Sequence, residues 1–227
     1  MTDAWVTACV LLYGDHPDLA ARFFDSWRRF GTGIELRAGL NACGPGTREI
    51  VNAAAATPTG DRGIRLVESP VNLGKPGMMR RLFHTPPLAT EWVVWFDDDS
   101  FLHRADWLVS LEIAIAAQPE AVMLGIPAHV DLGIGSTLRE RIEAAPWFRG
   151  RPIQPSDSAG KTARIDFILG GFWALRTSWI RRLDWPSGPI THSEDDILLG
   201  EAIRQNGGRL GRFRSGVKID TAPRRSR

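Results

Sequence analysis

The chain has 227 residues, of which 43% are apolar and 24% charged, a balance typical of a globular protein that excludes a disordered or fibrous one. The net charge of +2 argues against nucleic acid as a partner, and two cysteines, Cys9 and Cys43, are too few for a disulfide framework. No run of about eighteen apolar residues and no secretory signal pattern occurs, so we expect a cytoplasmic protein without a transmembrane segment. We expect the basic tail 221–227, which ends in PRRSR, to be solvated, with peripheral contact to an anionic membrane surface as the alternative.

The first half of the chain alternates apolar runs with helical patterns. These patterns predict strands at residues 7–13, 34–40, 64–68 and 92–96, and helices at 17–30, 47–56, 76–83 and 107–117. The alternation favours a single Rossmann-like α/β domain whose mostly parallel central sheet is flanked by helices. Ligands of such sheets bind beyond the carboxyl ends of the strands.

The second half is less regular. Its patterns predict strands at 121–127, 165–176, 210–213 and 217–219, and helices at 138–145 and 193–206. Residues 129–164 are rich in Gly, Pro, Ser and Arg. A segment this long and irregular is either a functional loop or disordered.

Three aspartates, Asp97, Asp98 and Asp99, directly follow the apolar run 92–96, so they fall at the carboxyl end of a strand. Adjacent carboxylates repel one another and are costly to bury unpaired, so they need a counter-charge. A divalent cation with phosphate oxygens supplies one, and Asp97 and Asp99 are spaced to reach one centre. The alternative is an exposed acidic turn or a helix N-cap, because Ser100 and the aspartates suit both.

A second carboxylate cluster opens the last expected helix. Glu194, Asp195 and Asp196 fall in its first turn, with Ser193 as a suitable N-cap. The helix dipole favours acidic residues there without any further function. It also keeps a carboxylate ionised, as a catalytic base requires, so the two clusters together indicate a metal-bound leaving group and a separate base.

The stretch NLGKPG, residues 72–77, leads from a strand into a helix. Asn72 and Gly74 allow a tight turn, Lys75 is a point charge for phosphate, and Arg80 lies on the following helix. The glycines match neither a Walker loop nor a dinucleotide fingerprint, which argues against both. Taken alone, the stretch is also compatible with an ordinary surface turn.

In their order and spacing, these motifs resemble those of family 2 glycosyltransferases with the A-type nucleotide-sugar fold. The landmarks are an apolar first strand, NLGK, FDDDS, the segment LGGFWALR and the helix SEDDILLGEAIRQNGGRL. They extend over nearly the whole chain. The resemblance implies a glycosyltransferase domain at 1–220, with a nucleotide-binding half at 1–100 and an acceptor-binding half at 101–220.

The resemblance also implies a metal site and a base. Asp97 and Asp99 would hold Mn²⁺ or Mg²⁺ against the nucleotide diphosphate, with Asp220 as the nearest candidate for a third ligand. Asp98 would lie near the ribose. Asp195, directly after Glu194, would take the proton from the acceptor hydroxyl.

Other matched residues would contact the donor. Gly170 and Gly171 would lie beside the donor sugar and the acceptor, and Trp173 next to them would offer an apolar face to a sugar ring. Two positions depart from the family pattern. Asn41 stands where many relatives have an aspartate that bonds the nucleotide base, and Met79 stands where many have an arginine.

These features predict a metal-dependent, inverting transfer of a sugar from a UDP- or GDP-sugar to a hydroxyl of a glycan, lipid-linked or small acceptor. Lys75 and Arg80 would neutralise the departing diphosphate, and residues 129–164 would close over the donor and exclude water. Two alternatives stay open. One is an aspartate-nucleophile phosphatase or phosphotransferase, which also uses D-x-D at a strand end, and the other is a non-catalytic nucleotide-sugar binding domain.

Overall fold

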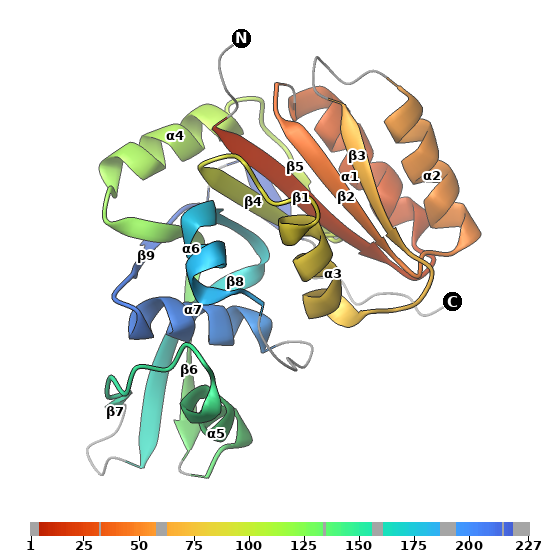
Figure 1. Ribbon diagram of the computed structural model, residues 1–227. Helices are drawn as coiled ribbons and strands as arrows, with labels where there is room; N and C mark the ends of the chain where they lie inside the picture. Colours follow the sequence, from red (N-terminus) through yellow and green to blue (C-terminus); the bar gives the residue numbers. More distant parts are fainter. Residues whose placement is uncertain are drawn as a thin grey trace.

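The computed structural model shows an α/β fold with helices on both faces of one large sheet (Figure 1). It describes residues 5–31, 33–57, 63–133, 135–155, 161–186, 194–214 and 216–219. Of the helices in these ranges the longest has 14 residues, and none combines the length and apolar character needed to cross a membrane.

The first half of the chain supplies the parallel part of the sheet. Its elements are β1 (Val6–Tyr13), α1 (Pro17–Phe30), β2 (Glu35–Asn41), α2 (Pro45–Ala56), β3 (Ile64–Ser69), α3 (Gly74–His84) and β4 (Trp92–Asp97). The apolar runs of β1 and β4 are buried along almost their whole length, as expected for strands covered on both faces. Pro17 and Pro45 open their helices at positions where a backbone N–H would have no helical partner.

The second half completes the sheet and adds its irregular parts. Its elements are β5 (Ser100–Leu102), α4 (Trp107–Ala117), β6 (Ala121–Gly133), α5 (Thr137–Ala144), β7 (Gln154–Pro155), β8 (Thr162–Arg176), α6 (Thr177–Leu183), α7 (Asp195–Gln205), β9 (Arg209–Arg212) and β10 (Val217–Ile219). The sheet order is β3-β2-β1-β4-β8-β6-β9, with β7 paired to β8, and β5 and β10 form a separate pair. Along the main path only β8 runs against its neighbours, so the prediction of a mostly parallel sheet is confirmed.

Each face of the sheet carries its own hydrophobic core. Side chains of α1, α2 and α4 pack on one face, and those of α3, α5, α6 and α7 pack on the other. On the second face the rings of Trp95 and Trp173 stack with centroids 5.8 Å apart. Because neighbouring strands β4 and β8 supply these rings, the core joins the two halves of the chain.

The structure differs from the sequence-based expectation between residues 129 and 164. β6 continues to Gly133 and pairs with β8 back to Thr162, so the two strands project beyond the rest of the sheet (Figure 1). Leu138, Ile142 and Trp147 are buried beside this projection, where they extend the apolar core of the second face. Part of the expected irregular segment is therefore regular, and residues 156–160 lie outside the described ranges.

Three short elements were not predicted at all. They are β5, β7 and α6. The predicted N-cap of the last helix, Ser193, lies outside the described residues, and α7 begins at Asp195. The remaining strands and helices occur where the sequence predicts them, with ends that shift by a few residues.

Gly200 lets α7 lie directly on β8. A Cβ atom at this position would lie 2.8 Å from the carbonyl oxygen of Asp166 and 2.9 Å from Cα of Phe167, and both are backbone atoms that cannot turn away. The close contact fixes the distance between helix and strand. It therefore helps to place Asp195 at the first turn of the same helix.

We predict that Gly200→Ala destabilises the protein, although alanine is the better helix former by about 1 kcal/mol. The clash with the backbone of β8 should outweigh this gain and leave a net loss of about 1 to 2 kcal/mol in the free energy of unfolding. Chemical denaturation measures the change. Gly133→Ala is the matched control, since its Cβ would meet nothing within 4 Å, and a Gly200→Ala protein as stable as that control would contradict the prediction.

Candidate functional site

The acidic turn lies at the carboxyl end of β4, as predicted. Asp97 is the last residue of the strand, and Asp98 and Asp99 form the turn that leads into β5. Ser100 Oγ donates a hydrogen bond of 2.6 Å to the carbonyl oxygen of Gly171 in β8. This bond holds the turn against the glycine pair.

The ammonium group of Lys75 joins the two carboxylate clusters. Its Nζ lies 3.1 Å from Oδ2 of Asp97 and 3.0 Å from Oδ2 of Asp195. The Lys75 and Asp195 side chains are 8% and 5% exposed, so the contact between them is shielded from water. Trp95 Nε1 donates a 2.8 Å hydrogen bond to the other carboxylate oxygen of Asp97. The ammonium group of Lys75 in α3 thus contacts a carboxylate from β4 and a carboxylate from α7.

The turn before α3 is held from beneath by Asn41. Its Oδ1 accepts a hydrogen bond from Leu73 N at 2.8 Å, and its Nδ2 donates to Asn72 Oδ1 at 2.9 Å. Asn72 Oδ1 also accepts a bond from Gly74 N. Asn41 is only 2% exposed, and its side-chain amide shapes the turn.

The first turn of α7 lies against the glycine pair. Asp196 Oδ2 accepts a 3.1 Å hydrogen bond from Gly170 N, and its Oδ1 accepts one from Ile197 N. A Cβ atom at Gly170 would lie 3.3 Å from Nζ of Lys75, so glycine leaves room for the ion pairs. Glu194, the N-cap residue, contacts Arg141 of α5.

The carboxylates outnumber the cations in this site. Burial, followed by the charges of Asp99 and Asp97, raises the pKa of Asp98 to about 7. Burial also raises the pKa of Asp97 and of Asp99 above their ordinary values. Burial lowers the pKa of Lys75, but the charges of Asp97 and Asp195 outweigh burial and raise it. One ammonium therefore faces more negative charge than it can neutralise.

A divalent cation fits this charge balance. Carboxylate oxygens are the ligands that Mg²⁺ and Mn²⁺ accept, and Asp99 offers them at the end of the strand. Within the described ranges, no group of three or more His, Cys, Asp or Glu side chains is arranged to hold a metal. Asp220, the predicted third ligand, lies outside those ranges.

Two predicted ligand residues lie elsewhere. Arg80 donates to the carbonyl oxygen of Pro186 at 2.6 Å and to Asp184 Oδ1 at 3.1 Å, so it is directed to the end of α6 and not to the acidic turn. Trp173 is 1% exposed and stacks on Trp95 in the core. Its ring cannot lie against a sugar, and the prediction for Trp173 is wrong for that reason.

Two residues of the site were missed from the sequence. Trp95 lies two positions before Asp97 in β4 and therefore on the same side of the strand, a spacing that could have indicated the contact. From the sequence, Ser100 suits an acidic turn or a helix N-cap. Its bond to Gly171 depends on the pairing of distant segments, which no local pattern reveals.

No protein-family model matches the sequence, and no curated protein sequence matches it either. The structure is similar to that of the mannosyltransferase PcManGT from Pyrobaculum calidifontis in complex with GDP-Man and Mn²⁺, with a TM-score of 0.67 and 19% identity over 97% of this chain and 58% of that one. It is also similar to TarS from S. aureus in complex with UDP-GlcNAc, with a TM-score of 0.60 and 14% identity over 91% of this chain and 56% of that one.

A more distant similarity is to CMP:2-keto-3-deoxy-manno-octonic acid synthetase complexed with CTP, with a TM-score of 0.51 and 11% identity over 92% of this chain and 89% of that one. At such identities the likeness shows the fold alone. The chain has the A-type glycosyltransferase fold, and it spans a little over half the length of the solved PcManGT chain and of the solved TarS chain, which comprises residues 1–349.

We predict a pH dependence of stability from Asp196. Burial, followed by the charge of Asp195, raises its pKa from 3.8 to about 6 in the folded protein. The folded state therefore keeps a proton that the unfolded state has released, so stability should fall as the pH rises from about 4 to about 6. Asp196→Asn should flatten this fall in melting temperature, measured with a chelator present. Asp131→Asn, at an exposed position of β6, is the control and should leave the pH profile unchanged.

Proposed function

We propose that this protein transfers a sugar from a nucleoside-diphosphate sugar to a hydroxyl acceptor, with inversion at the anomeric carbon. The observation that supports it most is the meeting of Asp97 and Asp195 at Lys75, at the carboxyl edge of a sheet with the A-type fold. GDP-Man and UDP-GlcNAc are bound by PcManGT and TarS, so a GDP- or UDP-sugar is the proposed donor.

The donor would bind over the acidic turn. Asp99, with Asp97 and Asp220, would hold Mn²⁺ or Mg²⁺, and the bound cation would supply positive charge against the leaving diphosphate. Asp98 would face the ribose, and the backbone around Asn72 would border the phosphates. Gly170 and Gly171 would leave space for the sugar, since they have no side chains.

Asp195 is the proposed base. It opens α7, where the helix dipole stabilises an ionised carboxylate, and it is held at 3.0 Å by Lys75. It would accept the proton of the acceptor hydroxyl as that oxygen attacks the sugar. Glu194 would support the turn through Arg141. In this arrangement residues 1–100 bind the nucleotide and residues 101–220 bind the acceptor.

Lys75 has a second role in this proposal. The sequence predicts a contact of Lys75 with phosphate, and in the structure its ammonium is shared between Asp97 and Asp195. Two carboxylates that both contact one cation also lie close to each other. They repel each other once the cation is removed. Lys75 is therefore proposed to position Asp195 while it adds positive charge near the diphosphate.

The first test is a donor panel. Purified protein with Mn²⁺ should release free nucleoside diphosphate from one GDP- or UDP-sugar when an acceptor is supplied, and Asp195→Asn should lower transfer at least about 100-fold. Donor binding, followed as a rise in melting temperature, should remain. Transfer by Asp195→Asn at the wild-type rate would exclude it as the base.

The same panel separates the alternatives. A phosphatase would release inorganic phosphate, and Asp97 would become labelled as an aspartyl phosphate. A binding domain without turnover would gain stability from a nucleotide sugar and release no nucleotide. Either result would replace the proposed transfer.

We predict that Lys75→Met lowers both stability and transfer. Removing the ammonium leaves Asp97 and Asp195 without their shared partner, which should cost about 3 kcal/mol in the free energy of unfolding. In the double variant Lys75→Met with Asp97→Asn, part of the stability should return, because one of the two repelling charges is gone. Lys218→Met, at an exposed position of β10, is the control. A Lys75→Met protein as stable as this control would show that the ion pairs contribute little.

A further inference from the structure

A groove of about 550 Å³ lies at the far end of α7 from Asp195. It is bordered by the projecting β6–β8 pair and by β9. Four arginines line it, together with His129 and a single acidic residue, Asp166; the arginines are Arg164, Arg204, Arg209 and Arg212. We call this the arginine groove.

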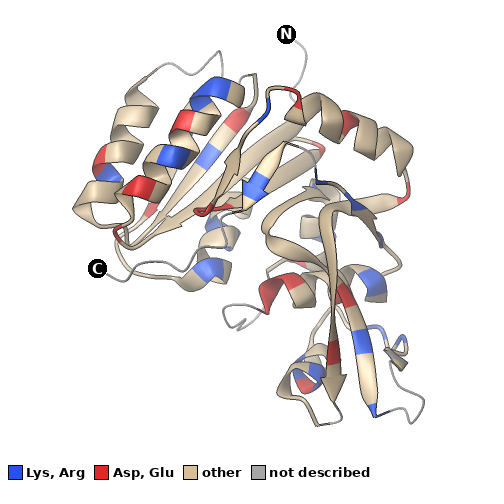
Figure 2. Cartoon of the chain, turned by 180° about the vertical axis from the view of Figure 1, so that it is seen from behind, with Lys and Arg blue, Asp and Glu red and all other residues tan. Residues whose placement is uncertain are grey.

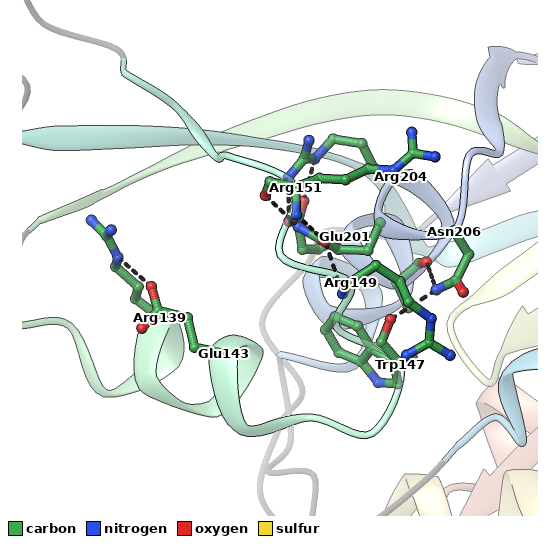
Figure 3. A network of polar contacts seen from close by, with 10 residues as sticks. Arg139, Glu143, Trp147, Arg149, Arg151, Glu201, Arg204 and Asn206 are labelled. Atoms are coloured by element: carbon green, nitrogen blue, oxygen red, sulfur yellow. Dashed lines mark hydrogen bonds and ion pairs between the residues drawn. The ribbon is translucent and has the colours of Figure 1, made fainter.

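The arginines of the groove are not fully neutralised. Arg164 pairs with Asp166 at 2.9 Å, and Arg204 pairs with the buried Glu201 at 2.6 Å (Figure 3). Arg209 and Arg212 are exposed and form no ion pair with another described residue. Figure 2 shows the basic and acidic positions of the projecting strands from behind. The groove therefore has an excess of positive charge and two guanidinium groups available to a ligand.

The position of the arginines follows from the local sequence. In RLGRFR, residues 209–214, Gly211 and Phe213 are buried while Arg209, Arg212 and Arg214 are exposed. β9 ends beside Gly125, and β6 continues past it toward the projection, so the strand leaves a step at Arg212. Arg209 opens β9 opposite Ala121, and both arginines line the groove. The planar guanidinium group suits carboxylate, sulfate or phosphate oxygens.

The lining favours a sugar polymer over a nucleic acid or a lipid. Single-stranded nucleic acids are commonly held by bases stacked on exposed Phe, Tyr or Trp rings, whereas Phe167 of the lining is only 8% exposed. Insertion of an amphipathic element into a bilayer surface needs exposed apolar side chains. The exposed large apolar residues Val109 and Ile113 lie on α4, away from this groove, and Leu169 lies between the groove and the glycine pair.

The groove is connected to the candidate active site through two elements. Phe167 lies three residues before Gly170 in β8, a separation of roughly 10 Å along a strand. Arg204 lies nine residues after Asp195 in α7, or roughly 14 Å along a helix. A polymer bound in the arginine groove could thus place one of its next few monomer units at Asp195.

We propose that the arginine groove binds the negatively charged groups of a polysaccharide acceptor and holds the acceptor chain while its terminal hydroxyl reaches Asp195. The groove is then an acceptor subsite outside the donor site. This inference rests on the proposed function, because it assigns the class of acceptor for that reaction.

The test measures binding of labelled dextran sulfate and of neutral dextran of the same length to the full chain. The wild type should bind dextran sulfate and not dextran. Arg209→Glu with Arg212→Glu should weaken binding at least about tenfold, while Arg29→Glu with Arg65→Glu, at exposed positions of α1 and β3, should change it less than about twofold. The variant Arg209→Lys with Arg212→Lys keeps both positive charges and is less disruptive to folding. It should lose less affinity for dextran sulfate than the variant with two glutamates.

The proposal would be overturned if the Arg209→Glu/Arg212→Glu and Arg29→Glu/Arg65→Glu variants lost equal affinity for dextran sulfate. The polymer would then be attracted by basic residues over the whole surface and not by the groove. Tighter binding of an oligonucleotide or of phosphatidylglycerol vesicles through the same arginines would also overturn it. Stabilisation by GDP or UDP with Mn²⁺ is measured in parallel and should be equal in all variants. Absence of that stabilisation in the wild type would count against the proposed function and not against the groove.

Discussion

A single ammonium group balances two carboxylates that come from distant parts of the chain. Lys75 lies within 3.1 Å of Asp97 and Asp195, and burial makes each of these charges unfavourable without the others. The end of β4, the start of α3 and the start of α7 are therefore coupled. If one of them is displaced, the other two are left with uncompensated charge. This coupling explains how Asp195 can be only 4% exposed at the start of a helix.

The strand β8 brings the two halves of the chain to this point. It runs antiparallel between β4 and β6, so the middle of β8 lies beside the acidic turn. The two glycines there allow close approach from both sides: Lys75 and Asp196 pack against Gly170, and Ile219 packs against Gly171. The site is thus positioned by paired strands and packed helices, which hold side chains more firmly than loops do.

Much of the fold could be predicted from the sequence because local patterns decide it. The apolar runs of β1 and β4 and the spacing of apolar residues in α1 report burial directly, and the position of Asp97 follows from the end of β4. The partners of Lys75 could not be predicted, since a lysine after a glycine turn looks the same whether it binds phosphate or carboxylate. The projection of β6 and β8 depends on pairing between residues 29 to 41 positions apart, from Gly133 with Thr162 to Pro127 with Ile168, which composition cannot reveal.

The C-terminal strand sets a limit for any shortened form of this protein. Within the pair of β5 and β10, Ile219 lies opposite Ser100 and Val217 lies opposite Leu102, so the last described strand is bonded to the residues that follow the acidic turn. Ile219 also fills the space above Gly171. A truncation before Val217 would release the turn from one side, whereas a boundary placed after Asp220 keeps this support together with the proposed metal ligand.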